Sequence, residues 1–137
     1  MCIERAVPAD YPVIADIDLE VMQANRLDPT SLEGRWWVAR RGASIVGYAG
    51  LEYAGYGEVG FLCRVGVQPE ARGRGLHRDF LRIREAEARK LGWTRLITYV
   101  HRLNVASLNN CVQCGYRAYA PSEEWGCDDA VYLYRDV

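Results

Sequence analysis

Apolar residues recur along this chain with two different spacings, and the spacing changes at breaks rich in glycine and proline. Residues 2–7 (CIERAV) alternate between apolar and polar, which predicts a short first strand. After the turn signal PAD, apolar residues fall three and four positions apart as far as Asn25. This spacing predicts a helix with Asp10 as its N-cap and a stripe of Val13, Ile14, Ile17, Val21 and Met22. The break at 26–34 (RLDPTSLEG) has room for a short second helix.

The middle of the chain changes to the period of two that is typical of strands. Residues 35–53 predict a hairpin with its turn at 41–43, and 57–67 predict a long strand. One face of that strand comprises Phe61, Cys63, Val65 and Val67. A helical stripe follows over 76–91, formed by Leu76, Phe80, Leu81, Ile83 and Ala88, and Gly92 is the expected stop.

The last third of the chain predicts a strand at 94–100, a short helix at 104–114 and two final strands. Asn104 is the expected N-cap of the short helix, whose apolar side comprises Val105, Leu108, Cys111 and Val112. The order of strands and helices predicts one α/β domain with a mixed sheet over residues 1–137.

Composition narrows the class of function. The chain is 50% hydrophobic and 26% charged with a net charge of −1, which gives no argument for a nucleic-acid partner. No apolar run approaches the roughly 18 residues that a membrane helix needs. Charges within the first 13 residues (MCIERAVPADYPV) argue against an export signal, so we expect a cytoplasmic protein.

Five cysteines are present, and an odd number in such a chain favours reduced thiols. Cys111 and Cys114 have the spacing of a redox pair or of half a zinc site. Zinc would need two more ligands, and the remaining candidates are scattered over separate predicted elements: Cys63, Cys127, His77 and His101. We therefore expect no metal.

The stretch 67–77 (VQPEARGRGLH) carries the clearest chemical signal. A predicted strand runs into a turn of alternating arginine and glycine, and a helix begins at once. The first N–H groups of a helix lack internal partners and carry the positive end of its dipole, so such a turn can cradle a phosphate. Arg72 and Arg74 would add charged donors. The stretch lacks the Gly-Lys-Ser/Thr ending of phosphate-loop NTPases and the third glycine of the dinucleotide motif.

This stretch resembles the acyl-CoA cradle of the GNAT superfamily of N-acyltransferases, whose pattern is Q/R-x-x-G-x-G/A. Arg72 and Gly75 match, whereas His77 stands where the family prefers glycine or alanine. The family's later helix carries N-x-x-A/S, then Tyr, then Gly-Phe. Asn104, Ser107 and Gly115 match that second motif, and Cys111 replaces the tyrosine.

The resemblance covers nearly the whole chain and implies the GNAT fold. That fold has about seven strands, about four helices, and a V-shaped splay between two parallel strands. It also implies that acetyl-CoA is the co-substrate and that a primary amine on a small molecule or peptide is the acceptor. The implied CoA-binding residues are Val65, Gly66, Val67, Arg72, Gly73, Arg74, Gly75, Leu76, His77, Asn104 and Ser107. A homodimer is left open, and nucleic acid and membrane are not expected partners.

The catalytic residues are harder to assign. Family members often place a base on the central strand, where this chain has Phe61. Glu52 and Glu58 are the remaining carboxylate candidates, and either is otherwise an ordinary exposed carboxylate at a strand end. A water that passes the proton to a backbone carbonyl is the alternative. Cys111 stands where the family keeps the tyrosine that protonates the leaving thiolate, and either donates that proton or simply packs. The changed residues leave open a non-catalytic acyl-CoA sensor.

The acceptor is not determined by these motifs. In the resembled family the last hairpin borders the acceptor site, and here that hairpin contains Trp125 and four acids: Glu123, Glu124, Asp128 and Asp129. They would attract a cationic amine, or they form an ordinary solvated loop. Trp36, Tyr53 and Tyr56 either line an acceptor pocket or belong to the core.

Overall fold

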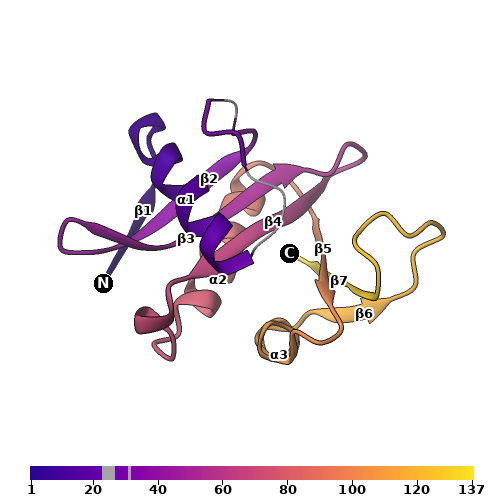
Figure 1. The fold of residues 1–137 in the computed structure, drawn as a ribbon. Helices are drawn as coiled ribbons and strands as arrows, with labels where there is room; N and C mark the ends of the chain where they lie inside the picture. The colour runs from indigo at the N-terminus through magenta and orange to yellow at the C-terminus, as the bar shows by residue number, and fades with distance from the viewer. Residues whose placement is uncertain (23–26, 31) are drawn as a thin grey trace. The chain divides into compact units, whose positions relative to one another are not determined.

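The computed structural model describes residues 1–22, 27–30 and 32–137, and the observed order of elements follows the sequence pattern (Figure 1). The strands are β1 (Cys2–Arg5), β2 (Arg35–Arg41), β3 (Ser44–Tyr53), β4 (Val59–Val67), β5 (Arg95–His101), β6 (Arg117–Tyr119) and β7 (Ala130–Asp136). The α-helices are α1 (Tyr11–Met22), α2 (Leu76–Lys90) and α3 (Val105–Gln113), with 3-10 turns at Pro8–Asp10 and Pro69–Ala71.

Two predicted helical segments lie partly outside the described residues. The expected continuation of the first helix over 23–25 lies outside them, as do Arg26 and Ser31 of the expected second helix. Within 27–30 and 32–34 the chain forms turns and irregular backbone rather than a helix. The described part of the chain therefore has three α-helices where the resemblance implies about four.

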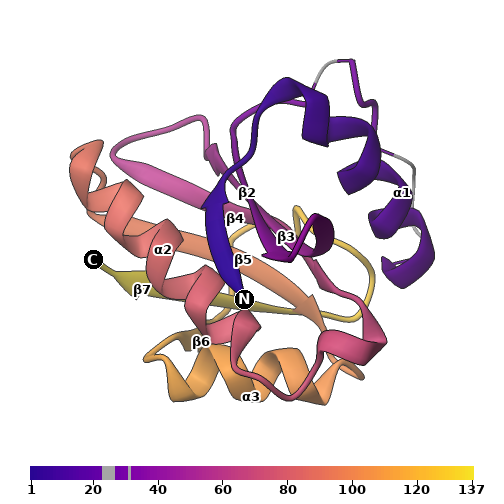
Figure 2. The same ribbon diagram turned by 90° about the vertical axis from the view of Figure 1, so that its left-hand side faces the viewer.

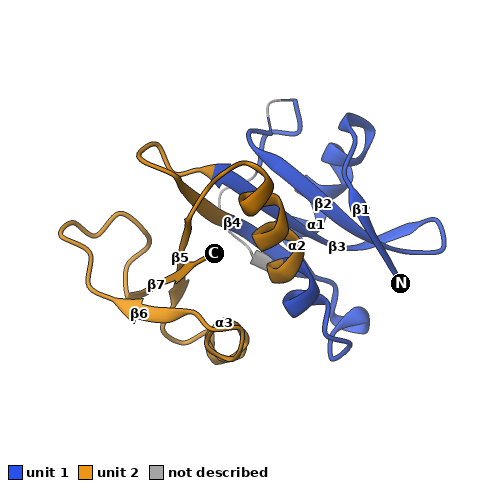
Figure 3. Ribbon diagram, turned by 180° about the vertical axis from the view of Figure 1, so that it is seen from behind, with its two compact units in different colours: residues 1–52, 63–80 blue, residues 53–62, 81–137 orange. Residues whose placement is uncertain are grey.

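The chain divides into two compact units, residues 1–52 with 63–80 and residues 53–62 with 81–137 (Figure 3). β4 contributes to both units, and the strand order is β1-β2-β3-β4-β5-β7-β6. β4 and β5 pair in parallel, whereas β1–β2, β2–β3, β5–β7 and β6–β7 are antiparallel. The predicted α/β class with a mixed, mostly antiparallel sheet is confirmed.

The parallel pairing covers only the beginning of both strands, from Val59 opposite Arg95 to Phe61 opposite Ile97. One residue further on, the carbonyl of Leu62 accepts the side-chain hydroxyl of Thr98 at 2.9 Å. Beyond these backbone pairs, a side-chain hydroxyl of β5 therefore serves as a donor to β4.

In the first unit, α1 packs on β2 and β3 (Figure 2). Ile14 and Ile17 lie against Trp36, Val38 and Tyr48 in one buried cluster. The predicted stripe is wrong at Val13, which is 41% exposed. The helical period instead brings Asp18, four positions after Ile14, to the buried side, where it is fully enclosed.

In the second unit, the two faces of β5 and β7 have different chemistry. One face carries Leu96, Thr98 and Leu133, all buried. The other carries Tyr99 and Tyr132, which are cross-strand partners in contact with Trp125 of the β6–β7 loop.

The ends of α2 and α3 follow the local sequence signals, whereas the prediction that Asp10 caps α1 is wrong: its carboxylate accepts the preceding Val7 N–H at 3.0 Å and Arg40 at 2.8 Å. Asn104 caps α3 by accepting the Ser107 N–H at 3.3 Å, and Gly92 and Gly115 take left-handed backbone angles after α2 and α3. The predicted apolar side of α3 is wrong at Val105 and Val112, each 58% exposed.

Two further observations bear on function. None of the described helices is long and apolar enough to cross a membrane. Among the described residues, no three His, Cys, Asp or Glu side chains gather as metal ligands would.

Candidate functional site

The strand–turn–helix segment of the first unit has an open backbone. β4 ends at Val67, a 3-10 turn follows, and residues 72–75 are exposed before α2 begins. Gly73 and Gly75 have φ angles of 79° and 78°, and a Cβ on either would meet nothing within 4 Å. The glycines are therefore needed for the left-handed backbone of the turn, and the space above it remains open to a bulky group.

Arg72 has a structural role that the sequence did not indicate. Its Nε donates to the carbonyl of Val67 at 3.0 Å, which closes the turn onto the strand. The Gln68 N–H donates to the Val46 carbonyl at 2.9 Å and ties the same point to β3. Arg72 is exposed and has further N–H donors beyond Nε, so it can close the turn and still face an anion.

The start of α2 presents backbone donors rather than side chains. Leu76 is 6% exposed, so only its N–H can serve a ligand. The first turn-to-turn bond of the helix runs from the Asp79 N–H to the Gly75 carbonyl at 3.0 Å. The N–H groups ahead of Asp79 have no carbonyl four residues back within the helix, and they carry its positive dipole end. Half-buried His77, in place of a glycine, adds a ring to this first turn.

The last residues of β4 are held from the α1 side. A Cβ on Gly66 would overlap the hydroxyl of Tyr48, so this glycine is required by packing, whatever its backbone binds. Cys63 also packs against the α1 cluster. In a regular strand, positions 63 and 66 would lie on opposite faces, whereas here both lie on the α1 side. β4 is therefore irregular between them, and the predicted single face of Phe61, Cys63, Val65 and Val67 is interrupted.

The two candidate bases differ in their surroundings. Glu52 is half-buried at the end of β3, and burial raises the pKa of its carboxyl, with Glu33 adding to the rise and Arg64 opposing it. Glu58 is exposed in the turn before β4, at the other end of that strand from the cradle. Nothing around Glu58 distinguishes it from a surface carboxylate.

The α3 residues belong to the second unit. The side-chain oxygen of Asn104 is engaged as the helix cap, which leaves its amide N–H groups and the Ser107 hydroxyl as donors. Cys111 is 3% exposed, and burial raises the pKa of its thiol to about 11. Cys111 and Cys114 are both free thiols.

Sequence reasoning missed a buried charge network beneath α3. Glu85 of α2 is 3% exposed and accepts the Tyr116 hydroxyl at 2.7 Å and Arg135 at 2.9 Å. It lies four positions after Leu81 on the buried stripe of α2, which was the only available signal.

The aromatic candidates have different surroundings. Trp36 is 2% exposed and donates its ring N–H to the Glu33 carbonyl, so it is a core residue. Tyr53 and Tyr56 are more than half exposed. Trp125 is 40% exposed and packs edge-on against Phe61 and Tyr99.

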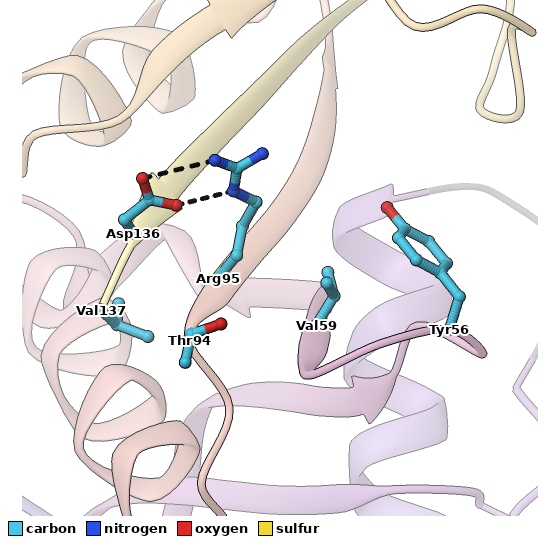
Figure 4. A pocket seen from close by; sticks show the side chains of 6 residues that line it. All are labelled: Tyr56, Val59, Thr94, Arg95, Asp136 and Val137. Carbon is cyan, nitrogen blue, oxygen red and sulfur yellow. Dashed lines mark hydrogen bonds and ion pairs between the residues drawn. The ribbon is translucent and has the colours of Figure 1, made fainter.

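A shallow pocket of about 590 Å³ opens elsewhere in the second unit (Figure 4). It is lined by Tyr56, Val59, Thr94, Arg95, Asp136 and Val137. Arg95 and Asp136 pair with one another at its wall at 2.6 Å. Tyr56, an aromatic candidate for the acceptor pocket, lines it, but none of the predicted CoA-binding or catalytic residues does. The pocket therefore does not coincide with the predicted acetyl-CoA site.

A mixed sheet in which a strand, a glycine turn and a helix follow one another can offer a site for a phosphate-bearing ligand. Residues 4–116 match the model of the acetyltransferase (GNAT) family, and the chain belongs to this family. No curated protein matches the chain significantly in sequence.

Solved structures support the fold over its whole length. The ribosomal-protein-alanine N-acetyltransferase from Brucella melitensis is 22% identical, covers 100% of both chains and has a TM-score of 0.78. An acetyltransferase from Bacillus subtilis in complex with CoA is 18% identical, covers 98% of this chain and 97% of its own, and has a TM-score of 0.80. A phosphinothricin acetyltransferase from Sinorhizobium meliloti in complex with acetyl-CoA is 17% identical, covers 99% and 88%, and has a TM-score of 0.81. At these identities the likeness establishes the GNAT fold, as predicted.

Proposed function

We propose that this chain is an N-acetyltransferase that moves an acetyl group from acetyl-CoA to a primary amine. The observation that carries the proposal is the open Arg-Gly-Arg-Gly turn between β4 and α2 in a chain of the GNAT family. Two similar structures were solved with CoA or acetyl-CoA. The open space beside Gly73 and Gly75 supports the binding of an anion such as a pyrophosphate at this turn.

In this proposal the cradle binds the donor through backbone and arginine groups. The N–H groups of Gly73 to His77 and the guanidinium groups of Arg72 and Arg74 hold the pyrophosphate. The backbone of Val65 to Val67 pairs with the extended arm that carries the thioester. Asn104 and Ser107 supply further polar contacts from α3.

The bound donor supplies an acetyl thioester, and the chain's residues prepare the amine that attacks it. The amine must lose a proton before it can act as a nucleophile. Glu52 is the proposed base, because its raised pKa makes it a stronger proton acceptor than an ordinary exposed carboxylate. The Val65 N–H is the proposed donor to the oxygen that becomes negative during the attack.

The acceptor is proposed as a cationic amine on a peptide or a small molecule. The similar structures include a ribosomal-protein-alanine acetyltransferase and a phosphinothricin acetyltransferase. Exposed carboxylates of the β6–β7 loop would attract a positive charge: Glu123, Glu124, Asp128 and Asp129. Asp129 already lies 3.6 Å from Arg102, so three of the four remain for such a ligand.

The proposal is tested by calorimetric titration with acetyl-CoA and by turnover on a panel of amines. The panel should contain an alanine-terminated peptide, a lysine peptide, a diamine and a neutral amino acid. Arg74→Ala should weaken acetyl-CoA binding about tenfold or more, as expected for a lost charge-assisted contact. Arg89→Ala, an exposed arginine in the last turn of the same helix, is the matched control and should bind as wild type.

Three outcomes separate the alternatives. Binding with turnover supports the transferase. Binding without turnover on any amine indicates a non-catalytic acyl-CoA sensor instead. Absence of acetyl-CoA binding by the folded wild-type protein would overturn both.

A further inference from the structure

Asp18 is a fully buried carboxylate with two side-chain partners from distant parts of the sequence. It lies on the core side of α1 and is 0% exposed. Its Oδ1 accepts the Tyr48 hydroxyl of β3 at 2.6 Å, and its Oδ2 accepts Arg64 of β4 at 2.5 Å. Burying an ion pair costs desolvation free energy, so the pair is weak evidence of a gain in stability. We therefore consider which parts of the chain the pair holds in position.

Both partners of Asp18 contact the part of β4 that leads to the cradle. Arg64 immediately precedes Val65, and Tyr48 is so close to Gly66 that a Cβ there would overlap its hydroxyl. Tyr48 itself is 0% exposed, so its ring cannot move away without opening the core. Asp18 therefore contacts, through Arg64 and Tyr48, the residues on either side of Val65.

We propose that Asp18 is a positioning residue of this transferase, which sets the strand segment Val65–Val67 through its two partners. The inference rests on the proposed function, in which that segment holds the thioester arm. A displacement of the segment by about 1 Å would misalign the donor, and misplacements of that size cost up to about 100-fold in rate.

The same network has a charge consequence at Glu52. The charged groups that act on Glu52 are Glu33, before β2, and Arg64, on β4. Arg64 is partly neutralised by Asp18, with which it forms an ion pair. Without the Asp18 charge, Arg64 stabilises the ionised form of Glu52 more strongly, and the Glu52 pKa falls.

The test uses the full chain with three variants and two measurements. Asp18→Asn removes the charge at nearly constant shape. Glu20→Gln is the matched control, because it removes an exposed carboxylate from the same helix. Arg64→Lys keeps the positive charge but loses the planar guanidinium geometry. The measurements are the Kd of CoA by calorimetry and the Glu52 carboxyl pKa by 13C NMR titration.

We expect Asp18→Asn to raise the Kd of CoA about tenfold and to lower the Glu52 pKa. Arg64→Lys should raise the Kd similarly and leave the Glu52 pKa as in the wild type, since the charge remains. Glu20→Gln should change neither quantity.

The outcomes that overturn the proposal are distinct from failure of the proposed function. A wild-type Kd in Arg64→Lys, or in folded Asp18→Asn, overturns the positioning role. An unchanged Glu52 pKa in Asp18→Asn overturns the coupling through Arg64. Should Asp18→Asn not fold, Arg64→Lys alone decides the positioning role. A wild-type protein that binds CoA but acetylates no amine contradicts the proposed function, and both measurements remain valid in that case.

Discussion

Cys111 stands where the family keeps a tyrosine, and it either protonates the leaving thiolate or only packs in the core. Replacing Cys111 by alanine distinguishes these two roles. The side chain is 3% exposed at the end of α3. Burial raises the pKa of its thiol to about 11, with Arg84 opposing the rise and Cys114 and Glu85 adding to it. The thiol therefore holds its proton throughout the neutral range.

A proton donor with this pKa is poorly matched to a leaving thiolate. With the free cysteine thiol, whose pKa is about 8.5, as the reference for the leaving thiol, transfer from Cys111 is uphill by roughly 3 kcal/mol at 1.36 kcal/mol per pKa unit. We expect Cys111→Ala to keep at least a tenth of wild-type turnover. Its free energy of unfolding should fall by about 1 kcal/mol, because the missing sulfur leaves a small cavity. For 137 residues at about 2.1 cal/mol/K each, this lowers the Tm by about 3 to 4 °C.

Turnover is measured by the loss of thioester absorbance, so that the exposed thiols of Cys2 and Cys127 do not contribute. Unfolding is followed by circular dichroism, and CoA binding by calorimetry. Cys114→Ala, the half-buried neighbouring thiol, is the control and should retain wild-type turnover. A loss of more than tenfold in folded, CoA-binding Cys111→Ala, with Cys114→Ala unaffected, would show that Cys111 acts in the chemistry.

Two further predictions follow from buried contacts. Tyr116→Phe should lower the free energy of unfolding, measured in urea, by about 2 kcal/mol, because the Glu85 carboxylate loses a hydrogen bond in a buried site. Tyr53→Phe, at an exposed hydroxyl, should change it by less than about 0.5 kcal/mol. Equal effects of the two substitutions would refute the stabilising role of the buried Tyr116–Glu85 hydrogen bond. Glu52→Gln should lower kcat/KM by about 10² or more and remove the rise of kcat/KM with pH on the acid side, since only the deprotonated carboxylate accepts the amine proton. Glu58→Gln should leave the pH profile unchanged, and the reverse result would move the base to Glu58.

Most elements, the ends of α2 and α3 and the glycine turn between β4 and α2 could be predicted from sequence because each depends on a few consecutive residues. Asn104 caps α3 through the N–H three positions on, and Gly115 ends that helix by its own backbone angle. Gly73 and Gly75 likewise determine the shape of the turn locally. In each case the partner or the conformation lies within one turn of chain.

Periodicity was less informative about which side of a helix is buried. The stripe of α1 lies one position away from Val13, and α3 buries Cys111 while Val105 and Val112 face solvent. Apolar spacing identifies a helix, but the neighbouring elements determine its orientation. A short helix such as α3 offers too few positions for the pattern to determine its rotation.

Only the tertiary structure revealed the buried charges. Asp18 and Glu85 lie on core-facing stripes, and their side-chain partners lie 30 to 50 residues away along the chain. An ion is tolerated in a core only when a partner compensates for its lost hydration. The sequence by itself indicated the family, most of the elements and the glycine turn between β4 and α2. The fold decided which carboxylates are buried and paired, because the compensating groups meet only when distant strands and helices pack together.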